Sequence, residues 1–228
     1  MDNVTVMDKL MARDFINVLA RLKNPQNFSG SHGIVESGDV VSWKDIRFSA
    51  KTAKDKEYAA HALYSIFIRQ EYKELGVRGR DVVDFGAFIG DTAVYFSKSG
   101  AKRVISMEKE PDSYAIAKDN IVLNDVKNVV LLNETASPER LDAIVEQYGL
   151  KGAALKLDVE GAEYDILLKS KDGTLRAFSE IMLEYHDGYL NIKRRLEGLG
   201  FRVRKIGKVC CDSVTKKAQG LLYAKAGA

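Results

Sequence analysis

The pattern of hydrophobic and polar residues divides the chain near residue 75. Before this point, apolar residues at helical spacing predict two amphipathic helices, over residues 7–22 and 53–75. Between them, residues 24–38 are polar and rich in glycine, which predicts a loop. The alternation in residues 40–48 predicts a short hairpin. We therefore expect residues 1–75 to form an N-terminal helical extension that carries a short hairpin.

After residue 80 the pattern changes, and short apolar runs alternate with segments of helical spacing. The apolar runs have the length of buried strands, and repeated strand–helix units indicate a parallel sheet with helices on both faces. We therefore expect an α/β fold over residues 76–228, with a doubly wound, mostly parallel sheet of seven strands, in which the last strand pairs with the one before it. The expected strands cover residues 81–85, 103–107, 128–132, 153–157, 180–183, 201–203 and 219–226, and the expected helices cover residues 92–99, 111–123, 138–148, 162–170 and 189–199.

The composition is that of an ordinary globular protein, because 46% of the 228 residues are hydrophobic and 29% are charged. This excludes a largely disordered chain. There is no run of about 18 apolar residues, so we expect no membrane span, and the acids near the N-terminus do not fit a secretory signal. The only two cysteines, Cys210 and Cys211, are adjacent, which excludes a disulfide framework and paired zinc motifs. We expect a reduced, cytoplasmic protein.

The net charge is close to balanced, at +3, but basic residues concentrate in one segment. Residues 193–217 contain nine Lys or Arg and only two acids. Such a stretch is most often a solvated edge. The alternative is a patch that binds an anionic substrate or a nucleic acid.

A glycine turn follows the first expected strand of the sheet, in the segment VVDFGAFIGDT over residues 82–92. Gly86 permits a tight turn, and Gly90 permits close packing of the helix that follows. This is the pattern of the first crossover in a nucleotide-binding sheet. The strict dinucleotide motif has a third glycine at the position of Phe88, so the glycine pattern alone does not select a ligand.

Asp84 discriminates between the possible ligands of this turn. It ends the strand at the sheet edge where open α/β sheets bind ligands. A carboxylate there would repel the pyrophosphate of a dinucleotide or of ATP. S-adenosylmethionine (AdoMet) has no phosphate and carries an ammonium and a sulfonium, and a close opposite charge attracts by roughly 4 kcal/mol before desolvation is subtracted. This favours AdoMet, with a simple turn-capping role for Asp84 as the alternative.

Polar residues also end the next two strands. Glu108 lies 22 residues after Gly86, the spacing at which an acid accepts hydrogen bonds from the ribose of a bound nucleotide. The third strand ends in Asn133, Glu134 and Thr135, which we expect to border the adenine. Loop polarity explains these three residues equally well.

Three acids follow the fourth strand in the run DVEGAE over residues 158–163. Asp158 is expected beside the first strand, facing the methionine end of the cofactor or the substrate, whereas Glu160 or Glu163 fits the start of the next helix, where acids are stabilised by the helix dipole. After the fifth strand, His186 fits a general base or a metal ligand, although a lone histidine is more often structural. Carboxylates suit Mg²⁺, but no spacing here demands a metal, and we assign none. The candidate catalytic residues are Asp158, Glu160, Glu184 and His186.

Four segments together resemble the FkbM-type methyltransferase family, a branch of the class I AdoMet-dependent fold with a Rossmann-like sheet. They are DFGAFIGDTAVYFS, MEKEPDSYAIAKDNIVLN, LKLDVEGAEYDIL and IMLEYH. The second segment is also similar to tRNA and rRNA methyltransferases, which have a comparable Glu-x-x-Pro run and Asn-x-x-Leu-Asn helix end. Methylases of exocyclic amino groups carry an Asn/Asp-Pro-Pro motif where this chain has DVEG. This difference argues against methylation of an exocyclic amino group. The FkbM-type family usually has a small polar residue at the position of Phe88.

The resemblance implies that Asp84, Gly86 and Gly90 line the AdoMet methionine, that Glu108 binds the ribose, and that Asp158 and Glu160 lie at the mouth of the active site. The expected cofactor-binding residues are therefore Asp84, Gly86, Ala87, Phe88, Gly90, Glu108, Lys109, Asn133, Glu134, Thr135 and Asp158.

The main functional hypothesis is an AdoMet-dependent methyltransferase that methylates a hydroxyl oxygen on a sugar or another small molecule, as FkbM-type enzymes do. One alternative is an RNA methyltransferase that uses the basic segment 193–217. A second alternative is a non-catalytic AdoMet- or nucleotide-binding module. Residues 1–75 are expected to cover the cofactor and shape the acceptor pocket, or to mediate a homodimer.

Overall fold

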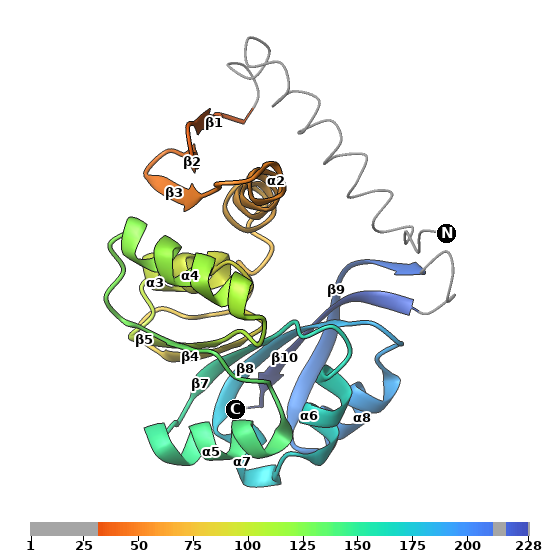
Figure 1. Cartoon of the computed structure of the whole chain (residues 1–228). Helices are drawn as coiled ribbons and strands as arrows, with labels where there is room; N and C mark the ends of the chain where they lie inside the picture. Colours follow the sequence, from red (N-terminus) through yellow and green to blue (C-terminus); the bar gives the residue numbers. More distant parts are fainter. Residues whose placement is uncertain (1–31, 212–217, 228) are drawn as a thin grey trace.

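The computed structural model describes residues 32–211 and 218–227, and its largest element is a seven-stranded sheet (Figure 1). The strand order is β6-β5-β4-β7-β8-β10-β9. The pairs among β6, β5, β4, β7 and β8 are parallel, whereas β10 runs antiparallel to both of its neighbours. The expected doubly wound, mostly parallel sheet is therefore confirmed. Its strands are β4 (Asp81–Phe85), β5 (Arg103–Met107), β6 (Val129–Leu132), β7 (Ala153–Leu157), β8 (Phe178–Tyr185), β9 (Phe201–Cys211) and β10 (Ala218–Ala226).

Helices cover both faces of this sheet (Figure 1). The face that carries α3 (Asp91–Lys98) and α4 (Pro111–Leu123) is opposite to the face that carries the other four helices. Local signals place the helix starts: Pro111 and Pro138 occupy the first turns, where a missing N–H costs nothing. The helices on the second face are α5 (Pro138–Tyr148), α6 (Glu163–Lys169), α7 (Asp172–Arg176) and α8 (Leu190–Gly198).

The chain reverses its direction along the sheet after β6. It moves outward from β4 to β5 and β6, and then returns to the other side of β4 with β7. Ligands of open α/β sheets bind at such a switch point, beyond the carboxyl ends of the strands. All five residues of the central strand β7 are buried, including Lys156. The topology therefore predicts a ligand-binding site at the carboxyl ends of β4 and β7.

Residues before β4 form a second, smaller unit that packs on α4. A three-stranded antiparallel sheet of β1 (Ile34–Ser37), β2 (Val40–Trp43) and β3 (Ile46–Ser49) precedes helix α2 (Ala53–Ala62) and the π-helix η2 (Leu63–Ile68). Two asparagines of α4 hold β3: the Asn120 side chain accepts from the Ser49 amide at 2.7 Å, and that of Asn124 from the Arg47 amide at 3.0 Å. This unit therefore shares an apolar core with α3 and α4.

The structure corrects several boundaries that periodicity predicted. The hairpin at 40–48 is confirmed, but part of the expected loop 24–38 is strand β1, because Ile34 pairs with Trp43. The single expected helix 53–75 ends at Ile68 in a π-helix, and the left-handed residue Gln70 follows. Strand β9 is longer than expected, and helix α7 was not predicted. The expected helix 7–22 lies outside the described residues.

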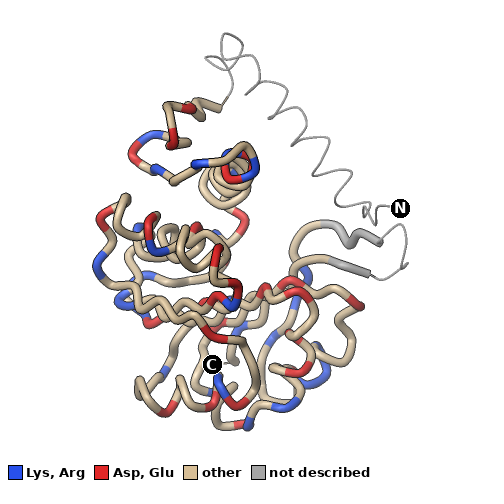
Figure 2. The backbone as a smooth tube through the Cα atoms, viewed as in Figure 1, with Lys and Arg blue, Asp and Glu red and all other residues tan. Residues whose placement is uncertain are grey.

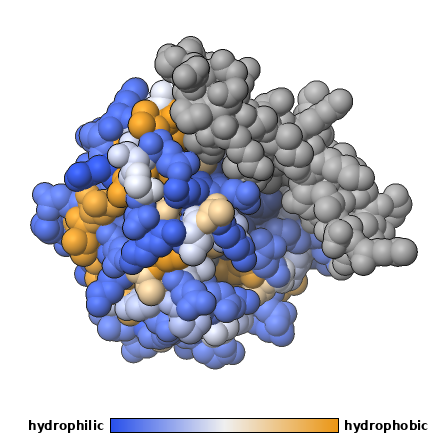
Figure 3. Space-filling model, turned by 45° about the horizontal axis from the view of Figure 1, so that its top comes forward, coloured by the Kyte–Doolittle hydropathy of each residue, from blue (hydrophilic) through white to orange (hydrophobic). Residues whose placement is uncertain are grey.

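The charged residues are distributed over the whole backbone rather than divided between its parts (Figure 2). The face in Figure 3 is mostly hydrophilic, with hydrophobic residues visible between the polar ones. Among the described residues, no helix is long and apolar enough to cross a bilayer.

Candidate functional site

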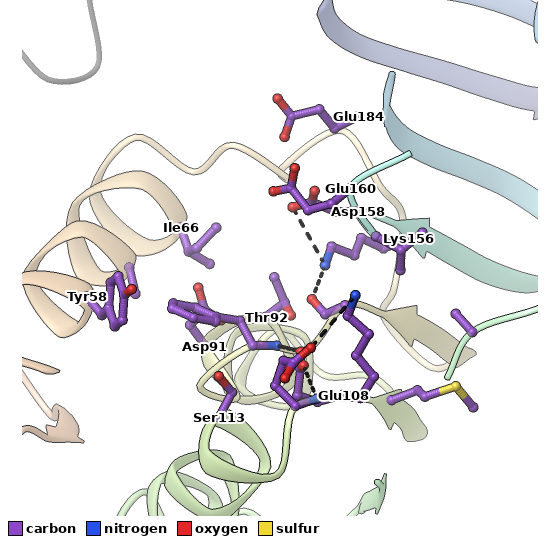
Figure 4. Close-up of a pocket in the computed structure, with 18 of the residues that line it drawn as sticks. Tyr58, Ile66, Asp91, Thr92, Glu108, Ser113, Lys156, Asp158, Glu160 and Glu184 are labelled. Atoms are coloured by element: carbon purple, nitrogen blue, oxygen red, sulfur yellow. Dashed lines mark hydrogen bonds and ion pairs between the residues drawn. The ribbon is translucent and has the colours of Figure 1, made fainter. Parts of the chain in front are cut away.

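A pocket of about 890 Å³ lies at the carboxyl ends of β4–β8, on the switch-point side of the sheet. The strand ends contribute its floor, and α2 and η2 contribute the opposite wall, where Tyr58 and Ile66 point inward (Figure 4). Glu108 lies toward one end of the view, and Asp158, Glu160 and Glu184 gather at the other. The pocket therefore has a cofactor-binding edge along β4–β6 and a second end beyond β7 and β8.

The glycine turn has no space for a side chain at Gly86. A Cβ atom there would lie 1.8 Å from the carbonyl oxygen of Asp158, and the backbone is left-handed at φ +84°. Gly90 has φ +81° and packs against Ala117 of α4. The two glycines therefore have the roles that the sequence predicted for them, a tight turn and close helix packing.

Asp84 lies beneath the turn and does not line the pocket. Its side chain is fully buried, and its Oδ2 accepts hydrogen bonds from Thr92 Oγ1 at 2.8 Å and Ser106 Oγ at 3.0 Å. Its Oδ1 lies 3.3 Å from Lys156 Nζ. Asp84 is thus placed to hold the loop, and Asp91 is the acid next to the turn that does line the pocket.

Glu108 ends β5 at the pocket, and its carboxylate holds the loop from the side. It accepts hydrogen bonds from the amide N–H of Phe88 and from that of Glu110, both at 2.8 Å. Lys109 also lines the pocket. Glu108 therefore lies where the sequence predicted a ribose-binding acid, with part of its hydrogen-bonding capacity used by backbone.

Phe88 has a left-handed backbone, at φ +46°, which is unusual for an aromatic residue. Its ring packs edge to face against Tyr58 of α2, with the ring centroids 4.9 Å apart. Both residues line the pocket. The aromatic pair therefore connects the cofactor loop to the wall formed by α2.

The residues after β6 differ in their placement. Glu134 and Thr135 line the pocket, and the Glu134 carboxylate accepts a 3.1 Å hydrogen bond from Arg140. Asn133 does not line it, because its amide donates to the backbone carbonyls of Glu108 and Lys109. Ala87 is fully buried and is also absent from the lining.

The second end of the pocket is strongly acidic. Asp158, Glu160 and Glu184 lie close together there (Figure 4), and Glu71 joins them from the segment after η2. The hydroxyl of Tyr72 lies 3.4 Å from Asp158 Oδ2. This end is therefore lined by proton acceptors and by one phenol.

His186 lies beside this acidic end and is oriented by a buried carboxylate. Its Nδ1 is 3.4 Å from Oε1 of Glu163, whose side chain is fully buried, and its Nε2 is 3.6 Å from Oε2 of the exposed Glu160. The Glu163 carboxylate also accepts from the amides of Val159 at 2.9 Å and Gly161 at 2.8 Å. The helix-start position predicted for Glu163 is confirmed, and its carboxylate also lies close to the imidazole.

Burial and mutual repulsion shift several pKa values in the pocket. Burial, together with the Asp158 charge, raises the pKa of Glu71 to about 7. Burial also raises the pKa of Asp91 to about 7. Burial and the neighbouring Asp158 likewise raise the pKa of Glu184. The acidic end therefore resists further negative charge.

Lys156 and His186 are the counter-charges of this end. Burial alone would lower the pKa of Lys156, but the carboxylates of Asp84 and Asp158 outweigh it and raise that pKa. Burial would also lower the pKa of His186, whereas Glu163 and Glu184 raise it. Lys156 Nζ is 4.0 Å from Asp158 Oδ2 and donates to the carbonyl oxygen of Gly86 at 2.6 Å. Lys156 thus contacts both the glycine turn and the carboxylates of this end.

The donor set fits AdoMet. The strand ends of β4, β5 and β6 form a continuous lining that contains glycine backbone, an acid at the ribose position and apolar atoms of Met107 and Ala136. Carboxylates outnumber basic side chains in the lining, although Lys156 lies next to Gly86, and this excess of acids suits a cationic methionine end and disfavours a pyrophosphate.

Several residues that line the pocket were not assigned to the site from the sequence, and four of them matter most for the argument. Tyr58 and Glu71 come from the N-terminal unit, and no motif marked them. Asp91 and Lys156 stand inside segments that were singled out, and the signal available for Lys156 was a lone charge in an otherwise apolar strand.

Comparison with known proteins gives one family match. A family model described as the TRM5/TYW2 methyltransferase domain matches residues 44–145. No curated protein matches the chain. The matched range contains α2, η2, the glycine turn and the strand ends that form the cofactor edge of the pocket.

Solved structures share the fold at low sequence identity. Trm5b from Pyrococcus abyssi is 15% identical with a TM-score of 0.55, over 83% of this chain and 56% of that chain. TYW2 from M. jannaschii in complex with AdoMet is 18% identical with a TM-score of 0.51, over 86% and 87% of the two chains. A precorrin-6y C5,15-methyltransferase from Geobacter metallireducens is 18% identical with a TM-score of 0.51, over 70% and 87%. These likenesses confirm the Rossmann-like class I methyltransferase fold.

The family match and the fold also confirm the enzyme class and the cofactor, an AdoMet-dependent methyltransferase. The predicted FkbM-type family is wrong, because the model that matches describes the TRM5/TYW2 domain. Two of the four segments that carried the resemblance, the glycine turn and the segment from Met107 to Asn124, lie inside that match. The physical reason for the error is that a tight glycine turn and an acidic strand end serve any AdoMet-binding sheet. The small-molecule hydroxyl acceptor, which came with that family, is not supported.

Proposed function

We propose that this enzyme methylates RNA, with transfer RNA as the first substrate class to test. The observation that carries the proposal is the match to the TRM5/TYW2 methyltransferase domain over residues 44–145. This range includes α2 and η2, which form the wall opposite the strand ends, and therefore includes part of the acceptor side of the pocket as well as the cofactor edge.

The cofactor edge aligns the methyl donor. Bound AdoMet supplies a methyl group on a positively charged sulfur. We assign Gly86, Glu108 and Thr135 to cofactor binding because they line one continuous edge at the ends of β4, β5 and β6. Lys156 holds the Gly86 carbonyl at 2.6 Å and keeps this turn in place. Alignment of donor and acceptor is the main catalytic contribution that such a rigid edge makes.

The acceptor end suits an unstacked nucleobase. Tyr58, Phe88 and Tyr72 supply aromatic surfaces within one pocket, and aromatic side chains stack on bases that have left a helix. Carboxylates accept hydrogen bonds from the N–H groups of a base, and a carboxylate whose pKa is raised to about 7, such as Glu71, is suited to accept a proton.

We place the phosphates outside this acidic end, on the side of the sheet edge formed by β10 and β9. Leu221 of β10 pairs with Glu184 on one side and with Ile206 of β9 on the other, so β9 continues past the sheet edge beside the acceptor end (Figure 1). The exposed Lys205 lies over the ring of Tyr189 at 5.4 Å. A cation next to an aromatic ring fits the backbone and bases of a single strand.

Three of the basic residues in the segment 193–217 already have acidic partners in the described part of the chain. Lys193 lies 3.6 Å from Glu197, Arg195 lies 2.7 Å from Asp172, and Arg204 lies 2.8 Å from Glu74. Lys205 is therefore the exposed cation of this segment that we assign to the phosphates.

We also propose that residues 1–75 act with residues 76–228 as one catalytic unit, in which the part from residue 53 onward is the wall of the pocket. Tyr58, Ile66 and Glu71 line the pocket from this part. A separate domain that covers the site only transiently is the alternative.

The test is transfer of a labelled methyl group from AdoMet to RNA by the full chain. We expect label in a tRNA pool and none in the same RNA after ribonuclease digestion. We expect Asp158→Asn to lower the transfer rate at least tenfold, because it removes a carboxylate at the acceptor end. The matched control is Asp165→Asn on the exposed face of α6, which should leave the rate unchanged. The proposal fails if AdoMet binds and no RNA accepts label.

A further inference from the structure

We propose that Asp158, Glu184 and His186 form a binding site for one divalent cation at the acceptor end of the pocket. One ligand atom from each of these residues lies within 4.8 Å of the others. Two ligands that are each about 2.1 Å from one ion are separated by at most about 4.2 Å. The three side chains therefore need only a small rotation to ligate the same ion.

The arrangement depends on two neighbouring strands. Asp158 follows β7 directly, and Glu184 and His186 stand on either side of the last residue of β8. Parallel pairing aligns Leu157 with Leu183, so the residues that follow on the two strands reach the same edge of the sheet. The site is thus attached to two central strands and not to a loop alone.

The orientation of His186 is the second observation that indicates a metal. The fully buried Glu163 carboxylate lies 3.4 Å from Nδ1, outside the proposed ligand set, and leaves Nε2 on the side of Glu160. Histidines that ligate metals usually donate their other ring N–H to a carboxylate, which fixes the ring and increases its basicity. Glu163 is itself held by two backbone amides, at 2.9 and 2.8 Å.

The charge balance also calls for a cation. The carboxylate of Glu184 forms no hydrogen bond and no close ion pair within the described part of the chain, and His186 is the positive group that acts on it. Asp158 and Glu160 carry further negative charge at this end. Lys156 is the nearest ammonium to Asp158, at 4.0 Å, but it is also engaged by Asp84 and by the Gly86 carbonyl. A divalent ion would neutralise the negative charge of this end that Lys156 leaves uncompensated.

The ligand types favour Mn²⁺ or Mg²⁺. Two carboxylates suit both ions, and the imidazole favours Mn²⁺. Three protein ligands leave open positions on an octahedral ion, which an oxygen or nitrogen of the methyl acceptor can occupy. This role in orienting the acceptor rests on the proposed function, whereas cation binding itself does not.

The experiment is a titration of the full chain with Mn²⁺, in which the electron paramagnetic resonance signal measures the concentration of the free ion. We expect one Mn²⁺ per chain, displaced by excess Mg²⁺. Glu184→Gln and His186→Asn should each weaken binding at least tenfold. The matched control is Glu146→Gln on the exposed side of α5, which should bind Mn²⁺ as the unmodified chain does. Circular dichroism of each variant verifies that it is folded, and Glu184→Gln changes no volume.

The proposal is overturned if the chain does not bind Mn²⁺ stoichiometrically, or if Glu184→Gln and Glu146→Gln bind it equally well. The titration contains no RNA, so it is independent of the proposed function. Mn²⁺ binding without RNA methylation would retain the cation site and reject the RNA substrate, and RNA methylation without Mn²⁺ binding would do the reverse.

Discussion

The ammonium of Lys156 donates a 2.6 Å hydrogen bond to the carbonyl oxygen of Gly86, and so joins the central strand β7 to the glycine turn after β4. The same ammonium lies 3.3 Å from Asp84, a fully buried carboxylate beneath the turn. A buried lysine is costly unless it is paired and hydrogen-bonded. The floor of the pocket therefore depends on one ion pair that the surrounding apolar strands enclose.

Replacement of Lys156 by methionine should destabilise the protein by about 3 kcal/mol or more, because it leaves Asp84 buried without its counter-charge. The measurement is urea unfolding at neutral pH. The control is Lys169→Met, which removes an exposed ammonium paired with Asp165 at 2.8 Å and should cost about 0.5 kcal/mol or less. Equal losses in the two variants would show that the buried pair is not important for stability.

Gly86→Ala should be far more damaging than Gly149→Ala. Both positions are left-handed, at φ +84° and +59°. Only at Gly86 would the new Cβ meet backbone, 1.8 Å from the Asp158 carbonyl oxygen, whereas nothing lies within 4 Å at Gly149. We expect about 1 kcal/mol of destabilisation at Gly149 from backbone strain, and loss of AdoMet binding at Gly86. Calorimetric titration with AdoMet checks this, and unchanged affinity in Gly86→Ala would exclude the turn from the cofactor site.

Tyr58→Ala should raise the KM for the RNA acceptor, and Tyr58→Phe should leave it unchanged. The ring of Tyr58 supports Phe88 at 4.9 Å, and Phe88 has a strained left-handed backbone. Loss of an edge-to-face pair costs about 1 kcal/mol, or roughly fivefold in an equilibrium constant. The readout is the KM for RNA with AdoMet held at saturation. A larger effect in Tyr58→Phe than in Tyr58→Ala would assign the role to the hydroxyl instead of the ring.

Asp91→Asn should change stability in a pH-dependent way. Burial raises the pKa of Asp91 to about 7, whereas in the unfolded chain it titrates near 4. Between these values the folded state retains a proton that the unfolded state has lost, so the contribution of Asp91 to stability decreases as the pH rises. Relative to the unmodified protein, Asp91→Asn should therefore be more favourable at pH 8 than at pH 5, by about 2–3 kcal/mol.

Urea unfolding at the two pH values measures this difference. The control is Asp112→Asn, which also stands in the first turn of a helix but is exposed. Asp112→Asn should change the free energy of unfolding by the same amount at both pH values. An equally pH-independent change in Asp91→Asn would contradict the prediction.

Local signals in the sequence predicted most of the fold. Pro111 and Pro138 mark helix starts that the structure confirms, and the apolar runs of β4, β5 and β7 have the predicted bounds. The predictions were wrong where tertiary contacts override periodicity. The helix expected over 53–75 ends at Ile68, and Ile34–Ser37 becomes a strand because β2 offers it a partner.

The cofactor edge of the pocket could be predicted in part from strand ends alone. Gly86, Glu108 and Thr135 line the pocket as expected, because the carboxyl ends of parallel strands must share one edge. Asp84, Ala87, Gly90 and Asn133 do not line it. Whether a strand-end side chain faces the pocket or the layer beneath depends on the rotation of the backbone in the turn, which sequence spacing does not specify.

By itself, the sequence determined the order of strands and helices, the glycine turn and the acidic character of the strand ends, since each follows from short-range periodicity and residue type. Only the tertiary structure decided that Tyr58 of the N-terminal unit lies against Phe88, and that Glu163 orients His186 beside Asp158 and Glu184. These residues are distant along the chain, and their meeting depends on how two layers of helices pack on one sheet.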